Sequence, residues 1–389
     1  MQLVAYGAQD VYLTGNPQIT FFKVVYRRHT NFSMESIRQV WMGGSELSGH
    51  MSCTISRNGD LVNGLHLQLD MGIATETANP GYTIIDTVEC EIGGQMIDRQ
   101  SGEWMEVYSE LTEPSQRLDT VASKTDGTNV GLNKFQMMSG CGGVSWAADI
   151  DKARWIVPLR FWFCRNPGLA LPLIALQYHE VKINLSFIDD LTNSPPVANK
   201  LYADYIYLDT DERRRFAQVS HEYLIEQVQR REYTGVLTTM DLDFNHPVKE
   251  LVWCAKRTVG SGLAPDLPGF TDMTDVFKEE TYQIKLNGHD RFSERPLEYF
   301  TRYQLWRHHS GSQLGFSALG TTYGENVAVY SFALKPEEHQ PSGTCNFSRI
   351  DNAQLLINGN TTSSEINVYA INYNVLRIMS GMGGLAYSN

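Results

Sequence analysis

The sequence has no block of basic residues. Its 389 residues include 44 Asp and Glu against 32 Lys and Arg, which gives a formal charge of −12. A nucleic-acid clamp draws much of its affinity from neutralised phosphates, and an acidic chain without a basic patch lacks that source. We therefore expect no direct contact with nucleic acid.

Closely spaced cysteines are also missing. The chain has six, at Cys53, Cys90, Cys141, Cys164, Cys254 and Cys345. None forms the CxxC pair of a zinc or redox site. This spacing predicts buried free thiols in a protein made in a reducing compartment.

Long hydrophobic runs are absent too. The longest apolar stretch, residues 168–176, is interrupted by Pro172 and is far shorter than the ~20 residues of a spanning helix. Residues 1–10 have neither the basic segment nor the apolar core of a secretory signal. We expect a soluble protein that is not secreted, although an assembled surface could still contact a membrane.

What the chain does have is alternation of apolar and polar residues with a period of two. In residues 65–71, for example, Leu65, Leu67 and Leu69 alternate with His66 and Gln68. This pattern is typical of strands with one packed face and one wet face. It predicts strands at residues 19–28, 65–71, 83–92, 155–164, 181–187, 223–229, 240–244, 282–286, 327–334 and 365–378.

Helical spacing is limited to two segments, residues 101–113 and 296–306. They also reveal an internal repeat. The pattern DRxSxxxMEVY from Asp98 matches DRxSxxxLEYF from Asp290, an offset of 290 − 98 = 192. A second match pairs residues 21–28 with residues 224–231 at 230 − 27 = 203. Two matches in the same order indicate one β-rich module written twice, joined within residues 189–200.

Such modules are most economically two-sheet sandwiches of the jelly-roll type. The fold class is therefore all-β, with two tandem eight-stranded jelly rolls and short helices in loops. We expect an N-terminal base segment at residues 1–17, a first jelly roll at residues 18–192 and a second at residues 193–389.

The candidate catalytic and metal-binding motifs in the sequence lack residues that they would need. His179-Glu180 and His221-Glu222 begin like a zincin motif, but no second histidine follows four residues later. The adjacent His308 and His309 would diverge rather than chelate one metal, so we interpret them as polar residues in a turn. We assign no catalytic, cofactor-binding or metal-binding residue and expect no cofactor.

Two further groups could bind ligands. Residues 209–215 begin like a calcium loop, but three arginines occupy the ligand positions, so the segment is interpreted as solvated or internally paired. Tryptophans such as Trp104 and Trp306 could line a sugar-binding surface, although core packing is the more economical interpretation.

Several long strings resemble the major capsid proteins of large nucleocytoplasmic DNA viruses, especially the algal-virus and mimivirus branches. They are VAYGAQDVYLTGNPQITFFK from Val4, LPLIALQYHEV from Leu171, YSFALKP from Tyr330, QPSGTCNFSR from Gln340 and YNVLRI from Tyr373. Together these strings span nearly the whole chain.

The resemblance implies a structural double jelly roll rather than an enzyme. It also implies homotrimers that form pseudo-hexagonal capsomers, which contact neighbouring capsomers and minor capsid proteins. These capsomers would tile an icosahedral shell over an internal membrane, in a virion assembled in the host cytoplasm. The alternatives are a minor capsid paralogue of the same fold and a glycan-binding β-sandwich protein.

Overall fold

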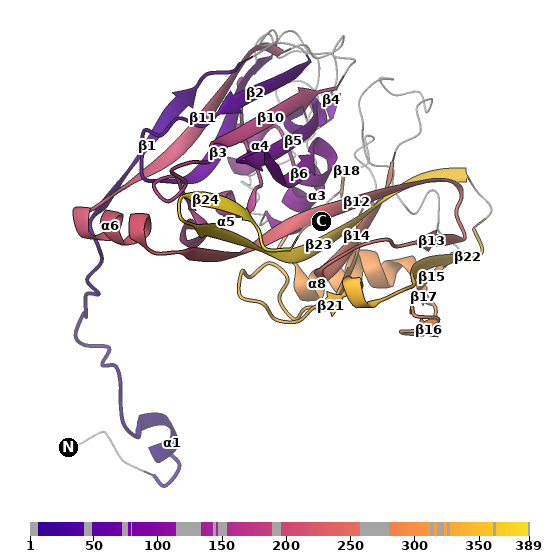
Figure 1. Cartoon of the computed structure of the whole chain (residues 1–389). Helices are drawn as coiled ribbons and strands as arrows, with labels where there is room; N and C mark the ends of the chain where they lie inside the picture. The colour runs from indigo at the N-terminus through magenta and orange to yellow at the C-terminus, as the bar shows by residue number, and fades with distance from the viewer. Residues whose placement is uncertain are drawn as a thin grey trace.

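Two β-sandwiches make up the body of the protein in this computed structural model (Figure 1). The structure describes residues 7–42, 49–71, 77–78, 80–113, 134–142, 145–146, 154–188, 196–256, 280–311, 315–316, 323–324, 327–360 and 363–387. The predicted join at residues 189–200 therefore lies mostly outside the described residues.

The first sandwich consists of two antiparallel sheets. One contains, in spatial order, β1 (Phe32–Gln39), β11 (Pro196–Leu208), β3 (Leu61–Met71) and β8 (Arg154–Pro158), with β9 (Leu171–Pro172) paired to β3. The other contains β2 (His50–Thr54), β10 (Val181–Phe187), β5 (Ile85–Ile92) and β6 (Gln95–Ser101). Alternate residues of both sheets point inward, so that Leu65, Leu67, Ile183 and Leu185 share one core.

The second sandwich repeats this order. One sheet contains β12 (His221–Val236), β23 (Ser363–Met379), β14 (Pro247–Lys256) and β20 (Val327–Ser331), with β21 (Cys345–Asn346) on β14 and β24 (Met382–Leu385) on β23. The other contains β13 (Thr239–Asp241), β22 (Ala353–Asn358), β15 (Thr281–Leu286) and β16 (His289–Asp290), with β17 (Arg295–Pro296) on β15. Both sandwiches therefore have the strand order of a jelly roll, and the fold is a double jelly roll.

Helices occupy the connections. They are α1 (Val11–Thr14), α2 (Pro80–Thr83), α3 (Gly102–Thr112), α4 (Lys134–Ser139), α5 (Trp162–Arg165), α6 (Thr210–Gln218) and α8 (Gln304–His308). The short helical turns are η1 (Pro167–Leu169), η2 (Tyr299–Tyr303), which is π-helical, and η3 (Phe347–Arg349). Two small two-stranded ribbons pair β4 (Thr77–Ala78) with β7 (Ser145–Trp146) and β18 (Gly315–Phe316) with β19 (Tyr323–Gly324).

The strand registers correct the internal repeat. Arg38 lies opposite Tyr202 in the first sandwich, and Arg230 lies opposite Tyr369 in the second. Arg230 therefore corresponds to Arg38, and their offset of 230 − 38 = 192 equals that of the helical match. The predicted match between residues 21–28 and 224–231 is wrong, but the duplication itself extends through the four-strand path of both sheets in each sandwich.

The join also differs from the expectation. β11 starts at Pro196 and pairs with β1 and β3, so residues 196–208 lie in the first sandwich. A proline is tolerated as the first residue of a strand, because its missing N–H is needed only farther along the ladder. The chain passes from one sandwich to the other through α6.

Several predicted strands are shorter than expected or absent; β20, for example, ends at Ser331, three residues before the predicted end. Residues 19–28 form no strand, because no strand in the described part of the chain pairs with them. β8 ends at Pro158, and the aromatic residues after it enter α5. β13 ends at Asp241, where the chain turns so that Phe244 N–H donates to the Leu242 carbonyl. Pro296, predicted in a first helical turn, instead ends β17.

Candidate functional site

In the part of the chain that the structure describes, no group of three or more His, Cys, Asp or Glu side chains is arranged so that it could hold a metal ion. His179 Nδ1 lies 3.0 Å from the Gly383 carbonyl, and His221 Nε2 lies 2.8 Å from the Phe216 carbonyl. Both histidines therefore have structural partners. Among the same residues, no helix has the length and apolar character needed to cross a bilayer.

The main feature of the body is the joint between the two sandwiches. α3 begins after Ser101, whose hydroxyl accepts the Trp104 N–H. One face of α3 carries Trp104, Val107 and Leu111, all fully buried. This face packs against the outer surface of the second sandwich, formed by Val252, Cys254, Val327, Val329, Tyr369 and Ile371. Burial of three such side chains contributes roughly 5–9 kcal/mol, so the sandwiches form one rigid unit.

Polar contacts fix the angle of this helix. Glu103 Oε1 accepts a hydrogen bond of 2.6 Å from Asn367 Nδ2 on β23. Its other oxygen lies 3.6 Å from Arg230 Nη2 on β12. A carboxylate in the first turn of a helix also interacts favourably with the helix dipole. Glu103 therefore links the start of α3 to two strands of the other sandwich.

A buried charge triad crosses the joint beside this contact. Glu226 on β12 accepts from Arg165 at 2.8 Å and lies 2.8 Å from Lys249 Nζ on β14. Burial favours the neutral form of Glu226, but Lys249 and Arg165 outweigh it and hold its pKa below the usual value. Arg165 belongs to the first sandwich, so the triad joins the two units.

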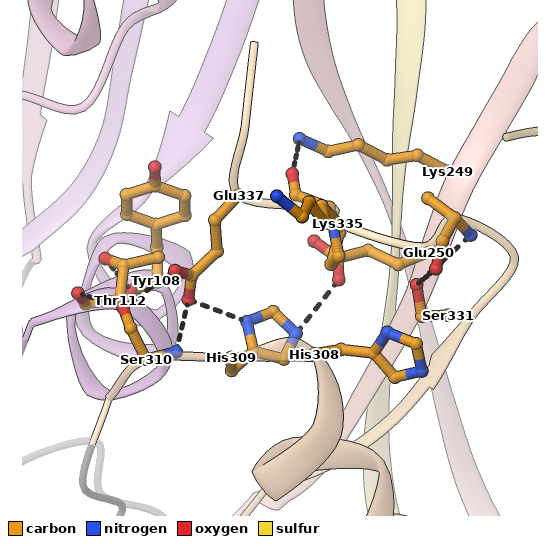
Figure 2. Close-up of polar contacts among 12 residues, drawn as sticks. Tyr108, Thr112, Lys249, Glu250, His308, His309, Ser310, Ser331, Lys335 and Glu337 are labelled. Carbon is orange, nitrogen blue, oxygen red and sulfur yellow. Dashed lines mark hydrogen bonds and ion pairs between the residues drawn. The ribbon is translucent and has the colours of Figure 1, made fainter. Parts of the chain in front are cut away.

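A second buried charge group closes the joint at the end of α8 (Figure 2). His309 Nε2 lies 3.0 Å from Glu250 Oε2, and its Nδ1 lies 3.2 Å from Glu337 Oε1. Burial alone would lower the pKa of His309, but the two carboxylates raise it to about 9. His309 is thus a buried imidazolium at neutral pH, whereas the sequence predicted only a polar residue in a turn.

The residues after His309 reach the first sandwich. Ser310 donates its N–H to Glu337 at 2.8 Å, and its hydroxyl lies 3.1 Å from the Thr112 carbonyl at the end of α3. The Gly311 N–H donates to the Leu111 carbonyl. These bonds satisfy carbonyls that a helix end leaves without partners. The imidazolium therefore holds a segment that caps α3.

The long strands β12 and β23 add a third connection. They extend beyond the second sandwich, and Ile225, Leu376 and Ile378 are buried in the core of the first. The β23–β24 hairpin then lies against the first sandwich so closely that a Cβ at Gly383 would be 2.7 Å from Leu176 Cδ2. Each sandwich is therefore completed by residues of the other half of the chain.

A groove of about 530 Å³ runs along the joint, between β6 and β12. Its charged lining includes Arg99 and Arg230. Arg99 pairs with Glu89 at 2.5 Å, and Arg230 pairs with Glu232 at 3.1 Å. Arg99 and Arg230 therefore each have a carboxylate partner close by.

The N-terminal arm, residues 7–31, is the second prominent feature. It leaves the body near α6 and carries α1 at its far end (Figure 1). Its apolar side chains are exposed, with Phe21 at 87% and Phe22 at 98%. Lys23, Arg27 and Arg28 oppose a single acidic residue in the arm, Asp10. A segment with exposed apolar side chains and three cations, lying away from the described body of the chain, is typical of a surface that binds a partner.

The other residues singled out by sequence serve the fold. Trp104, Trp155, Trp162 and Trp253 are buried, in agreement with core packing, whereas Trp306 is exposed. Residues 210–218 form α6, and Arg213 pairs with Asp60 at 3.0 Å, which agrees with internal pairing. All six cysteines are free, with Cys164 and Cys345 half-buried and the others buried.

Comparison with known proteins shows what this architecture belongs to. Residues 20–209 match the family model described as the major capsid protein N-terminus, and residues 212–384 match that of the large eukaryotic DNA virus major capsid protein. The chain is 49% identical to the major capsid protein of Pyramimonas orientalis virus, with 100% of this chain and 99% of the relative covered. It is 39% identical to that of Paramecium bursaria Chlorella virus 1, with the same coverage.

Solved structures agree. A quasi-atomic model of the Paramecium bursaria Chlorella virus 1 capsid matches with a TM-score of 0.76 and 35% identity, covering 95% of this chain and 100% of that one. The Faustovirus major capsid protein, at 12% identity and a TM-score of 0.66 over 96% of this chain and 94% of that one, shares the fold. The chain therefore belongs to the major capsid proteins of large eukaryotic DNA viruses, which are structural components of the virion and not enzymes.

Proposed function

We propose that three copies of this chain form a capsomer with a pseudo-hexagonal outline, and that such capsomers tile an icosahedral shell. The observation that carries the proposal is the duplication. Two sandwiches with the same strand order are fixed side by side in each chain, so a three-fold ring presents six similar units. The buried joint supports it, because a lattice unit has to keep a constant shape under load.

The N-terminal arm fits a role in contacts beyond the capsomer. We propose that residues 1–17 lie at its base, near minor capsid proteins and the internal membrane, in a shell assembled in the host cytoplasm. The exposure of the apolar residues in α1 supports such a contact. Direct binding of nucleic acid has no part in this proposal, since the chain carries a net charge of −12.

Light scattering coupled to size-exclusion chromatography tests the trimer. The purified full chain is expected to elute at about three times the 43.9 kDa of one chain. Negative-stain electron microscopy of the same fraction is expected to show three-fold particles with six-sided outlines. A protein that stays monomeric at near-physiological salt and micromolar concentration would contradict the proposal.

A further inference from the structure

The helical segment of the second sandwich corresponds to α3 of the first. η2 and α8 lie between β17 and β20, as α3 lies between β6 and β8. At the offset of 192, Met105 corresponds to Leu297 and Ser109 to Thr301. Met105 and Leu297 are buried in their own cores, and each hydroxyl donates to the carbonyl four residues earlier. The two helices therefore sit on their sandwiches in the same way.

Their outward faces differ in burial. The counterparts of Trp104, Val107 and Leu111, which the second sandwich covers, are Pro296, Tyr299 and Tyr303. Pro296 is exposed, Tyr299 is half-buried and Tyr303 is 44% exposed. One turn later Trp306 is 78% exposed, with its ring 6.2 Å from that of Tyr303. This aromatic face, defined as Pro296, Tyr299, Tyr303 and Trp306, has no cover within the described chain.

The sheets that contain β3 and β14 also differ in the burial of their outer sides, and here it is the second sandwich that is covered. β3 and β14 correspond residue by residue, because each has one bulged residue at the same place, Asn63 and Lys249. Along β14 every residue from Leu251 to Ala255 is buried, since α3 covers the outer side. Along β3 buried and half-buried residues alternate from Leu65 to Leu69, since the outer side has no such cover.

The uncovered side of the first sandwich can be named from this correspondence. Its residues are His66, Gln68, Ile156 and Tyr202, the counterparts of Val252, Cys254, Val327 and Tyr369. Ile156 is 38% exposed, whereas Val327 is 2% exposed. Tyr369 packs against Trp104 with ring centroids 5.0 Å apart, while Tyr202 stacks on His66 of its own sheet, at 5.3 Å. We define these four residues as the outer sheet face.

We propose that the aromatic face docks on the outer sheet face of a second copy of this chain. This inference rests on the proposed trimer and specifies its contact. The joint inside one chain is formed by a helix of the first sandwich and a sheet of the second. The aromatic face is the corresponding helix of the second sandwich, and the outer sheet face is the corresponding sheet of the first, so the two uncovered surfaces could form a joint of the same kind between two chains. Repeated head to tail, such a contact closes into a ring in which intrachain and interchain joints alternate.

The polar contacts that Glu103 makes in the internal joint have no equivalent in the proposed contact between chains. The counterpart of Glu103 is Arg295, and the counterpart of its partner Asn367 is Lys200. Two cations cannot form the same bond, and Arg295 instead lies over the Tyr299 ring at 5.2 Å. The interchain joint is therefore held by aromatic and apolar contacts, and substitutions in these residues are the informative ones.

Charged substitutions on each face test the contact. Tyr303→Asp and Ile156→Asp place a carboxylate in the interchain joint, and each is expected to weaken trimerisation at least tenfold in sedimentation equilibrium. Val236→Asp, at a residue that is 56% exposed and lies outside both faces, is the matched control and is expected to remain trimeric. Circular dichroism checks that all three variants keep the sandwich fold.

A photocrosslink identifies the partner directly. p-Benzoylphenylalanine at position 303, in a mixture of 14N- and 15N-labelled chains, is expected to give mixed-isotope crosslinks to peptides of β3, β8 or β11. A trimeric wild type whose crosslinks map elsewhere, with both aspartate variants still trimeric, would overturn this inference and leave the trimer intact. A monomeric wild type would instead overturn the proposed function.

Discussion

At the residue scale, the buried charges of the joint are what the sequence did not show. The sequence predicts that His309 is a polar turn residue, because His308 and His309 would diverge and a Ser-Gly-Ser turn follows them. Its partners, Glu250 and Glu337, come from other segments and meet it only in the folded chain. A carboxylate far along the chain leaves no local pattern, whereas the burial of Trp104 or Leu67 follows from periodicity alone.

The imidazolium makes stability depend on pH. The pKa of His309 is about 9 in the folded protein against 6.5 for the free side chain, so its contribution is complete below pH 6.5 and is lost as the pH rises through 9. The difference in unfolding free energy between wild type and His309→Gln is expected to be roughly 2–3 kcal/mol larger at pH 6 than at pH 9.5. Urea unfolding across this pH range measures the difference.

His308→Gln is the matched control, because burial lowers the pKa of His308 and no carboxylate pairs with it among the ion pairs described. The unfolding free energy of His308→Gln should change with pH as that of wild type does between pH 6 and pH 9.5. If the wild-type and His309→Gln curves run parallel from pH 6 to pH 9.5, the imidazolium assignment is wrong.

At the scale of elements, alternation located most strands, and it failed where pairing decides the outcome. Residues 181–187 form β10 as predicted, because both neighbours of the strand exist within the chain. Residues 19–28 have no partner strand among the described residues, so they form no strand and instead include a turn at Phe21 and Phe22. α6 was missed because its charged residues show no apolar stripe, and none of its residues is buried.

The shared core gives a test of how the elements depend on each other. Leu376 on β23 is fully buried in the core of the first sandwich. Leu376→Ala should cost about 2–5 kcal/mol and raise amide hydrogen exchange in β5 and β10. Leu355→Ala, equally buried but in the second core, should raise exchange in β15 instead. Faster exchange confined to the second sandwich in Leu376→Ala would contradict the shared core.

At the scale of the whole molecule, the repeat in the sequence indicated two modules, and the strings shared with capsid proteins indicated their arrangement. Periodicity alone gave neither strand order nor the place of the join, because both depend on contacts between distant strands. The correct offset of 192 for Arg230 emerged only from its pairing with Tyr369.

The arm is expected to be dispensable for the stability of the body. The described residues of the arm, 7–31, are almost all exposed, so deleting residues 1–31 should change the free energy of unfolding by less than about 0.5 kcal/mol. The same deletion should leave the trimer intact while reducing assembly into shells, measured by sedimentation of particles. A loss of several kcal/mol in urea unfolding would show that the arm packs on its own body.

The insertion of Leu376 and Ile378 into the first core also has a consequence for biosynthesis. A nascent chain leaves the ribosome from its amino end, and the sandwich that emerges first lacks the side chains that β23 contributes to its core. That half therefore waits, incompletely packed, until the second sandwich has been translated as far as β23. Truncated products would expose an unfinished interior to cellular proteases, which keeps partial subunits out of a growing shell.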